Sequence, residues 1–157
     1  MQKVTYEIDD INWYTNDECY SYLKNINGII SVNIKKDFYP LFTITYNENV
    51  ISHKIVFYEI CTFLNIPYNH SVLSFNYYPK DAKTYLLNLK GLCCDFCYRN
   101  LIEELFQTNG ILAVNERYEK HFIGNNFKEN LKIKYDDRII SELEIKELER
   151  KIRNTYC

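Results

Sequence analysis

No apolar run in this sequence approaches the roughly 18 residues that a membrane-spanning helix needs. The start, MQKVTYEIDD, has neither the basic flank nor the apolar core of a signal peptide. An excess of basic residues is also absent, because 19 Lys and Arg stand against 21 Asp and Glu, for a formal net charge of -2. A generic binder of nucleic acids or anionic membranes would carry such an excess. We therefore expect a soluble, cytoplasmic segment with no nucleic-acid partner.

The 157 residues are 46% hydrophobic and 25% charged, a balance typical of a globular chain that builds a core. Three of the six cysteines, Cys93, Cys94 and Cys97, lie within five positions. The other three are scattered: Cys19, Cys61 and Cys157. This spacing is not that of a secreted disulfide framework and favours a cytosolic thiol site.

The two halves of the chain contain matching blocks. Residues 23–33, LKNINGIISVN, match residues 105–115, LFQTNGILAVN, at an offset of 82. Residues 44–52, ITYNENVIS, match residues 133–141, IKYDDRIIS, at an offset of 89. The second half therefore has a seven-residue insertion, which falls in the polar stretch 116–130. The pattern indicates two copies of one small domain.

Each copy shows the same order of local signals. Alternating apolar residues predict the first strands at 3–8 and 85–89, and apolar residues three or four apart predict the helices that follow. Those helical positions are Cys19, Leu23 and Ile26 in the first copy, and Leu101, Leu105 and Phe106 in the second. Gly28 and Gly110 are predicted to follow the helix ends. Further strands are predicted at 29–34, 41–46, 71–77, 111–114 and 131–135.

Ser52 and Ser141 are predicted N-caps of second helices that end near Leu64 and Ile152, and Glu144 stands at the capping-box position after Ser141. This order predicts an α+β protein of two tandem ferredoxin-like (βαββαβ) domains, each an antiparallel sheet with two helices on one face. The predicted boundaries are 1–78, a linker at 79–84, and 85–157. The second copy ends where its last strand should begin, so either the chain has been cut or that copy is incomplete.

The segment 91–97, GLCCDFC, falls between the first strand and the first helix of the second copy. A C-x-x-C pair at such a turn lets two sulfurs converge, and the free N–H groups of the helix start stabilise negative charge. That arrangement favours the thiolate, which is both a nucleophile and a ligand of Cu(I), Zn(II) or Cd(II).

With these residues the second copy resembles the heavy-metal-associated domain family, whose motif is Gly-Met-x-Cys-x-x-Cys. Gly91, Cys94 and Cys97 fall on the motif, and Leu92 replaces the usual Met. Three further steps match: Ile102-Glu103, Gly110-Ile111, and Tyr135-Asp136, where Asp137 replaces the usual Pro. The resemblance implies the same ferredoxin-like fold and makes Cys94 and Cys97 metal ligands.

The double cysteine formed by Cys93 and Cys94 resembles the domains of zinc-, cadmium- and lead-exporting P-type ATPases more than copper ones. Two thiolates satisfy Cu(I), whereas Zn(II) and Cd(II) take about four ligands. Cys93 is therefore a candidate third sulfur and Asp95 a candidate oxygen donor, with Zn2+ or Cd2+ favoured and Cu+ possible. The alternatives are a packed strand-end thiol for Cys93 and a helix-start carboxylate for Asp95.

The remaining polar and sulfur residues are expected to be structural. The loop 9–15 of the first copy has no cysteine, so this copy is expected not to bind thiophilic metal, and Cys19 and Cys61 to be packing residues. Trp13 and Tyr14 in that loop form either a contact patch or an aromatic plug. The histidines His53, His70 and His121 are expected at the surface or in packing, with His121 in the insertion beside Glu119.

Two further features concern the end of the chain. Cys157 is a candidate fourth sulfur or simply a mobile terminus. A solvated helix face with i,i+4 ion pairs is predicted for the charged run Glu142, Glu144, Lys146, Glu147, Glu149, Arg150 and Lys151.

The first functional hypothesis is the N-terminal metal-binding segment of a heavy-metal P-type ATPase. Its partners would be a metallochaperone or the transporter's own membrane and catalytic domains. The chain contains neither a G-x-x-x-x-G-K-[ST] loop nor the Asp-Lys-Thr-Gly-Thr motif expected of the parent ATPase, so catalytic parts would lie beyond Cys157. A free-standing metallochaperone is the alternative. A thiol-disulfide oxidoreductase is a third reading, disfavoured because Asp-Phe separates Cys94 from Cys97.

Overall fold

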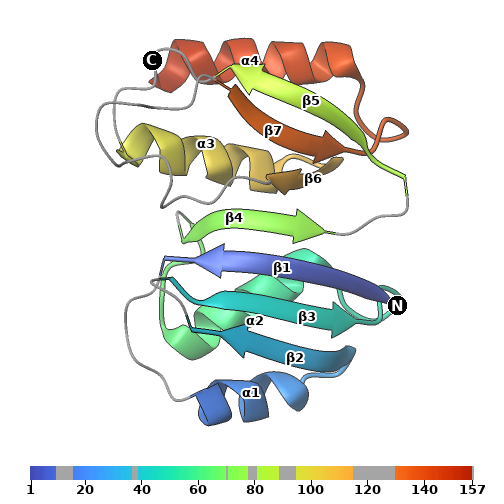
Figure 1. The fold of residues 1–157 in the computed structure, drawn as a ribbon, viewed down its shortest axis with the longest axis vertical. Helices are drawn as coiled ribbons and strands as arrows, with labels where there is room; N and C mark the ends of the chain where they lie inside the picture. Colours follow the sequence, from blue (N-terminus) through green and yellow to red (C-terminus); the bar gives the residue numbers. More distant parts are fainter. Residues whose placement is uncertain are drawn as a thin grey trace. The chain divides into compact units, whose positions relative to one another are not determined.

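The computed structural model describes residues 1–9, 16–36, 39–69, 71–77, 81–88, 95–114 and 130–156. This part of the chain forms four helices and seven strands (Figure 1): β1 (Gln2–Ile8), α1 (Asn16–Lys24), β2 (Ile29–Lys35), β3 (Leu41–Tyr46), α2 (His53–Leu64), β4 (Val72–Tyr77), β5 (Lys83–Asn88), α3 (Asp95–Gln107), β6 (Ile111–Val114), β7 (Asn130–Tyr135) and α4 (Glu142–Tyr156). None of the helices is both long and apolar enough to cross a bilayer.

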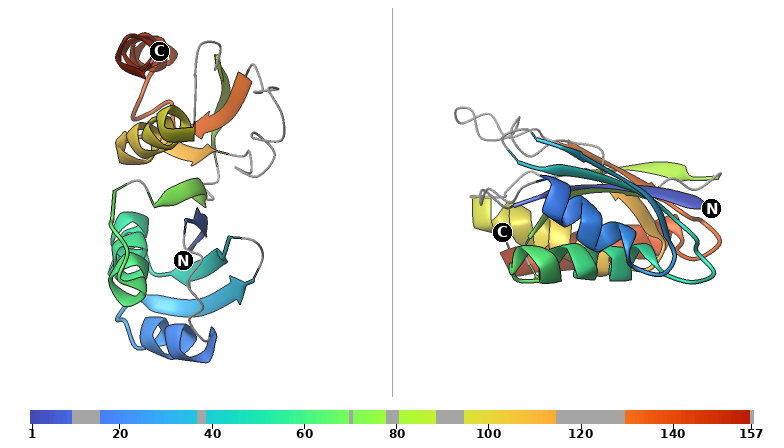
Figure 2. Two further views of the ribbon diagram at one scale, coloured as in Figure 1. Left: turned by 90° about the vertical axis from the view of Figure 1, so that its left-hand side faces the viewer. Right: turned by 90° about the horizontal axis from the view of Figure 1, so that it is seen from below.

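The chain divides into two compact units, Met1–Leu73 and Ser74–Cys157. In the first unit the strands lie in the order β2-β3-β1-β4, and both helices cover one face of them (Figure 2). The pairings of β3 with β1 and with β2 are antiparallel, and Ile44 lies opposite both Val4 and Val32. This strand order and the chain order β-α-β-β-α-β are those of a ferredoxin-like unit.

The core of the first unit follows from the period-two pattern of its strands. Val4, Tyr6 and Ile8 alternate along β1 and are fully buried, as predicted for a strand with one covered face. Phe57 and Ile60 of α2 are also fully buried, and the rings of Tyr6 and Phe57 lie 5.3 Å apart. Burying each such side chain stabilises the unit by about 1.5–3 kcal/mol.

In the second unit the strands lie in the order β4-β6-β7-β5, with α3 and α4 on one face (Figure 2). β7 pairs antiparallel with β5 on one side, where Leu131 lies opposite Leu87, and with β6 on the other. The predicted mixture of helices with antiparallel strands is therefore confirmed. The tandem-domain arrangement with boundaries 1–78, 79–84 and 85–157 stays a prediction.

The pairing of β4 differs from what the sequence predicts. The sequence assigns the strand 71–77 to the first copy as its last strand. In the structure, however, β4 crosses the unit boundary, and within the second unit Phe75 lies opposite Val114 and Asn76 opposite Ala113. The rings of Phe75 and Phe106 meet edge to face at 5.0 Å, so apolar contact accompanies the backbone pairing.

Two predicted helix limits are also corrected. The first helix does not include Ile26, because α1 ends at Lys24 and a tight turn follows, in which the Ile26 N–H donates to the Leu23 carbonyl at 3.1 Å. The last helix does not end near Ile152 but runs to Tyr156. An i,i+4 ion pair between Glu149 and Arg153 supports this last turn.

Candidate metal centre

Cys93 and Cys94 lie in sequence between β5, which ends at Asn88, and α3, which begins at Asp95 and contains Cys97. Cys93 and Cys94, the first two predicted sulfur ligands, lie outside the described residues. Asp95, the predicted oxygen donor, is the first residue of α3, and its side chain also lies outside the description. Cys97 is therefore the one predicted ligand whose side chain the described structure places.

Cys97 lies in the first turn of α3, on the side of the helix that faces the core. Its side chain is 8% exposed, whereas the neighbouring Phe96 is 66% exposed. The next inward positions are Tyr98 and Leu101, which are buried, so the helix period turns Cys97 inward. The structure therefore places this side chain on the buried side of α3.

A thiolate at this buried position needs a positive charge close to the sulfur. Burial disfavours a charged sulfur, while the unpaired N–H groups of a helix start favour it. A metal cation bound to the sulfur removes the cost of burying its charge. The Cys97 thiol can therefore serve either as an inert packing group or as a metal ligand, and a second donor from the preceding segment decides between the two.

Among the described residues, Cys97 does not belong to a group of three or more donors that could hold a metal ion. Within ranges such as 81–88 and 95–114, no three His, Cys, Asp or Glu side chains gather in a way that could hold a metal ion. Because Cys93 and Cys94 lie outside these ranges, their grouping with Cys97 stays a prediction.

Some of the other cysteines and histidines lie among the described residues, and others do not. Cys19 and Cys61 are each 2% exposed, in α1 and α2, so the prediction that they are packing residues is confirmed. His53 is partly buried at the start of α2, and burial, helped by Lys54, lowers the pKa of its imidazole to about 4. His70, His121 and Cys157 lie outside the described residues, as do Trp13 and Tyr14.

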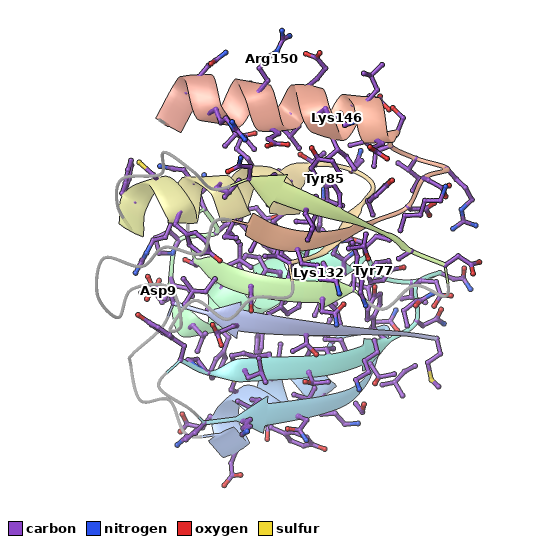
Figure 3. All side chains as sticks on the ribbon, turned by 45° about the horizontal axis from the view of Figure 1, so that its top comes forward. Asp9, Tyr77, Tyr85, Lys132, Lys146 and Arg150 are labelled. Atoms are coloured by element: carbon purple, nitrogen blue, oxygen red, sulfur yellow. The ribbon has the colours of Figure 1, made fainter. Side chains whose placement is uncertain are left out.

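The last helix contains a residue, Glu149, whose environment differs from the prediction. Most of its charged run is exposed as predicted, with a Lys146–Glu142 pair at 2.9 Å and an Arg150–Glu147 pair at 2.5 Å. Lys146 and Arg150 lie on the outer side of α4 (Figure 3). Glu149 does not belong to this face, because its side chain is 13% exposed and accepts hydrogen bonds inside the unit.

A signal for Glu149 was present in the sequence. It lies four residues after Ile145 and three before Ile152, and both of these isoleucines are buried. A carboxylate at an inward helical position is costly unless hydrogen bonds satisfy it. This spacing predicts a partnered acid at position 149 rather than a solvated one.

The fold and the site define a mixed α/β protein with antiparallel strands and a buried cysteine at a helix start. No protein-family model and no curated protein sequence matches the chain. The solved structures that are similar to it over most of its length include the following two. One is the N-terminal extension of CzcP from Cupriavidus metallidurans, with 14% identity, 95% of each chain covered and a TM-score of 0.35.

The other is the N-terminal soluble domains of CopA from Bacillus subtilis. It shares 14% identity with this chain, and the alignment covers 97% of this chain and 90% of that one, with a TM-score of 0.38. Similarity at these TM-scores does not establish a common fold or site. The chemistry of the site therefore rests on this chain's own residues.

Proposed function

We propose that this chain binds a thiophilic heavy-metal ion through Cys94 and Cys97. Cys93 is a third sulfur donor and Asp95 an oxygen donor, so that the site favours Zn(II) or Cd(II), which take about four ligands, over Cu(I). The ion is cargo, held by thiolates that can exchange it with another thiolate site.

The observation that carries this proposal is the place of Cys97. Its thiol is 8% exposed in the first turn of a helix that starts directly after the Cys93-Cys94 pair. A helix start supplies N–H groups that favour negative charge, and a bound cation balances the rest of that charge. The burial of Cys97 limits the access of water to this ligand of the completed site.

We further propose that the chain is the N-terminal metal-binding segment of a heavy-metal P-type ATPase on its cytoplasmic side. It would accept the cation from a metallochaperone, or pass it to the transporter's own domains, by stepwise thiolate exchange. The resemblance of residues 91–97 and of the helix after them to the heavy-metal-associated domain family supports this context. Residues 85–157 would carry the ion, and residues 1–78 would be a related domain without the C-x-x-C pair.

The test is an anaerobic titration of the fully reduced chain with Zn(II), Cd(II) and Cu(I), following thiolate-to-metal absorption and stoichiometry. We expect one divalent ion per chain. Binding should be lost in Cys94→Ser and Cys97→Ser. In Cys93→Ser, Cd(II) and Zn(II) affinity should fall by far more than Cu(I) affinity.

Cys61→Ser is the matched control, because it makes the same change at a buried cysteine of the first unit. It should leave the stoichiometry at one ion. Equal losses for all three ions in Cys93→Ser would reject the divalent assignment, and a reduced wild-type chain that takes up no metal would reject the proposed function itself.

A further inference from the structure

A partly buried polar cluster joins α4 to the end of β5. The Glu149 carboxylate accepts hydrogen bonds from the Tyr85 hydroxyl, from the Asn88 backbone N–H at 3.3 Å and from the Arg153 guanidinium at 2.6 Å. Tyr85 projects from β5 toward α4 (Figure 3). All four residues belong to the second unit.

The place of Asn88 makes this cluster relevant to the cysteines. Asn88 is the last residue of β5 and pairs with Asn130 of β7. Only residues 89–94 separate it from α3, and they include Cys93 and Cys94. Glu149 therefore binds the backbone at the point where the chain leaves the sheet toward the predicted ligands.

The first unit offers an internal comparison. Glu149 and Arg153 match residues of α2 at the offset of 89, and Tyr85 matches a residue of β1 in the aligned strand patterns. The matched residues are all apolar and buried: Val4, Ile60 and Leu64. In the first unit, which lacks the C-x-x-C pair, apolar side chains occupy these positions of the helix and the strand. In the second unit a carboxylate takes one of these positions, although burying it costs free energy.

The charges within the cluster balance. Arg153 compensates the carboxylate of Glu149, so the pair adds no net negative charge to the unit that carries the proposed thiolate ligands. Burial, together with the hydrogen bond to Glu149, raises the pKa of the Tyr85 hydroxyl to about 12, so this group stays a donor at neutral pH. The cluster supplies directed hydrogen bonds without changing its charge.

We propose that Glu149 is a positioning residue for the metal site: by holding the Asn88 backbone it fixes the start of the segment that carries Cys93 and Cys94. This inference rests on the proposed function, in which those cysteines bind metal. Residues that orient metal ligands typically change metal affinity by about 10- to 100-fold when they are mutated.

The experiment compares the full-length wild type with Glu149→Ala, Glu149→Gln and the control Glu147→Ala. Glu147 lies two residues away on the same helix, but its side chain is 57% exposed. We expect Glu149→Ala to weaken Cd(II) affinity by about 10- to 100-fold. Glu149→Gln, which keeps an acceptor oxygen, should recover part of that loss, and Glu147→Ala should stay within about twofold of the wild type.

A second measurement uses the metal-free chain. Amide hydrogen exchange at Asn88 and residues 89–94 should accelerate in Glu149→Ala, while exchange in β7 stays at the wild-type rate. A purely structural role would instead accelerate exchange evenly through the second unit and leave the Cd(II)–thiolate absorption per bound ion unchanged. That result would overturn the inference.

The two proposals fail separately. If the wild type binds no metal, the proposed function is rejected, and the exchange data still decide whether Glu149 holds the segment. If the wild type binds Cd(II) but neither affinity nor local exchange changes in Glu149→Ala, the positioning role is rejected. Should Glu149→Ala not fold, Tyr85→Phe decides: unchanged affinity and unchanged exchange at residues 89–94 reject the role.

Discussion

A single methyl group added at Gly110 would meet Ile140 Cγ2 at 2.6 Å, and one added at Gly28 would meet Ile51 Cγ2 at 2.8 Å. Both glycines have positive φ, +92° and +95°, a backbone conformation that residues with a Cβ rarely adopt. We expect Gly110→Ala and Gly28→Ala each to lower the free energy of unfolding by about 1–3 kcal/mol. Urea unfolding followed by circular dichroism measures the change.

Gln107→Ala provides the control for this prediction, because Gln107 is exposed and ends the helix that precedes Gly110. It should change the free energy of unfolding by no more than about 0.5 kcal/mol. If Gly110→Ala were as mild as this control, the positive φ and the close approach of Ile140 would both be incorrect.

Individual side chains were only partly predictable from the sequence. The helical spacing correctly predicted that Cys19 and Cys61 are buried, because apolar residues three or four positions away lie on the same helix face. The same spacing places Glu149 on the buried face of α4, but its charge led to the prediction that it is exposed to solvent. The partner that makes its burial tolerable, the Tyr85 hydroxyl, lies 64 residues away in sequence, so no local pattern could reveal it.

At the scale of elements, α4 begins with a reciprocal capping box. The Ser141 hydroxyl accepts from the Glu144 N–H at 3.2 Å, and the Glu144 carboxylate accepts from the Ser141 N–H at 2.7 Å. We expect Ser141→Ala to lower the free energy of unfolding by about 1 kcal/mol, because it leaves a helix-start N–H without its partner. The urea midpoint should fall at an unchanged slope.

Ser141→Asp is the conservative control, since an aspartate accepts the same N–H bond and should recover most of the loss. Ser52 offers a second comparison, because its hydroxyl accepts from the Ile55 N–H at 3.3 Å without a returning carboxylate. Equal stability of Ser141→Ala and the wild type would show that the capping box contributes nothing to α4.

The helices and strands themselves were easier to predict from the sequence than the pairing of the strands. Alternation predicted β1, and the Gly and Ser boundary signals predicted the starts of β2, β6, α2 and α4 to within a residue. These signals are local, because period and caps are read from neighbouring residues. The pairing of Phe75 with Val114 is not local, and no pattern in the sequence of β4 predicts it.

At the scale of the whole molecule, stability should fall as the solution is acidified below pH 6.5. Burial, with a contribution from Lys54, lowers the pKa of the His53 imidazole from 6.5 to about 4. Between these values the unfolded chain binds a proton that the folded chain does not, so folding loses free energy as pH falls. His53 should account for about 1–3 kcal/mol of this loss between pH 6.5 and 4.

The measurement is the free energy of unfolding from urea titrations at pH 7.5, 6, 5 and 4.5, for the wild type, His53→Phe and Glu144→Gln. His53→Phe should flatten the slope over this window, because the titrating group is removed. Glu144→Gln should keep the wild-type slope, since hydrogen bonds from Ser141 hold the pKa of the Glu144 carboxyl below its usual value and its contribution is lost only at lower pH. A wild-type stability that stays constant from pH 7.5 to 4.5, or a His53→Phe slope equal to that of the wild type, would place the His53 imidazole in water rather than at the partly buried start of α2.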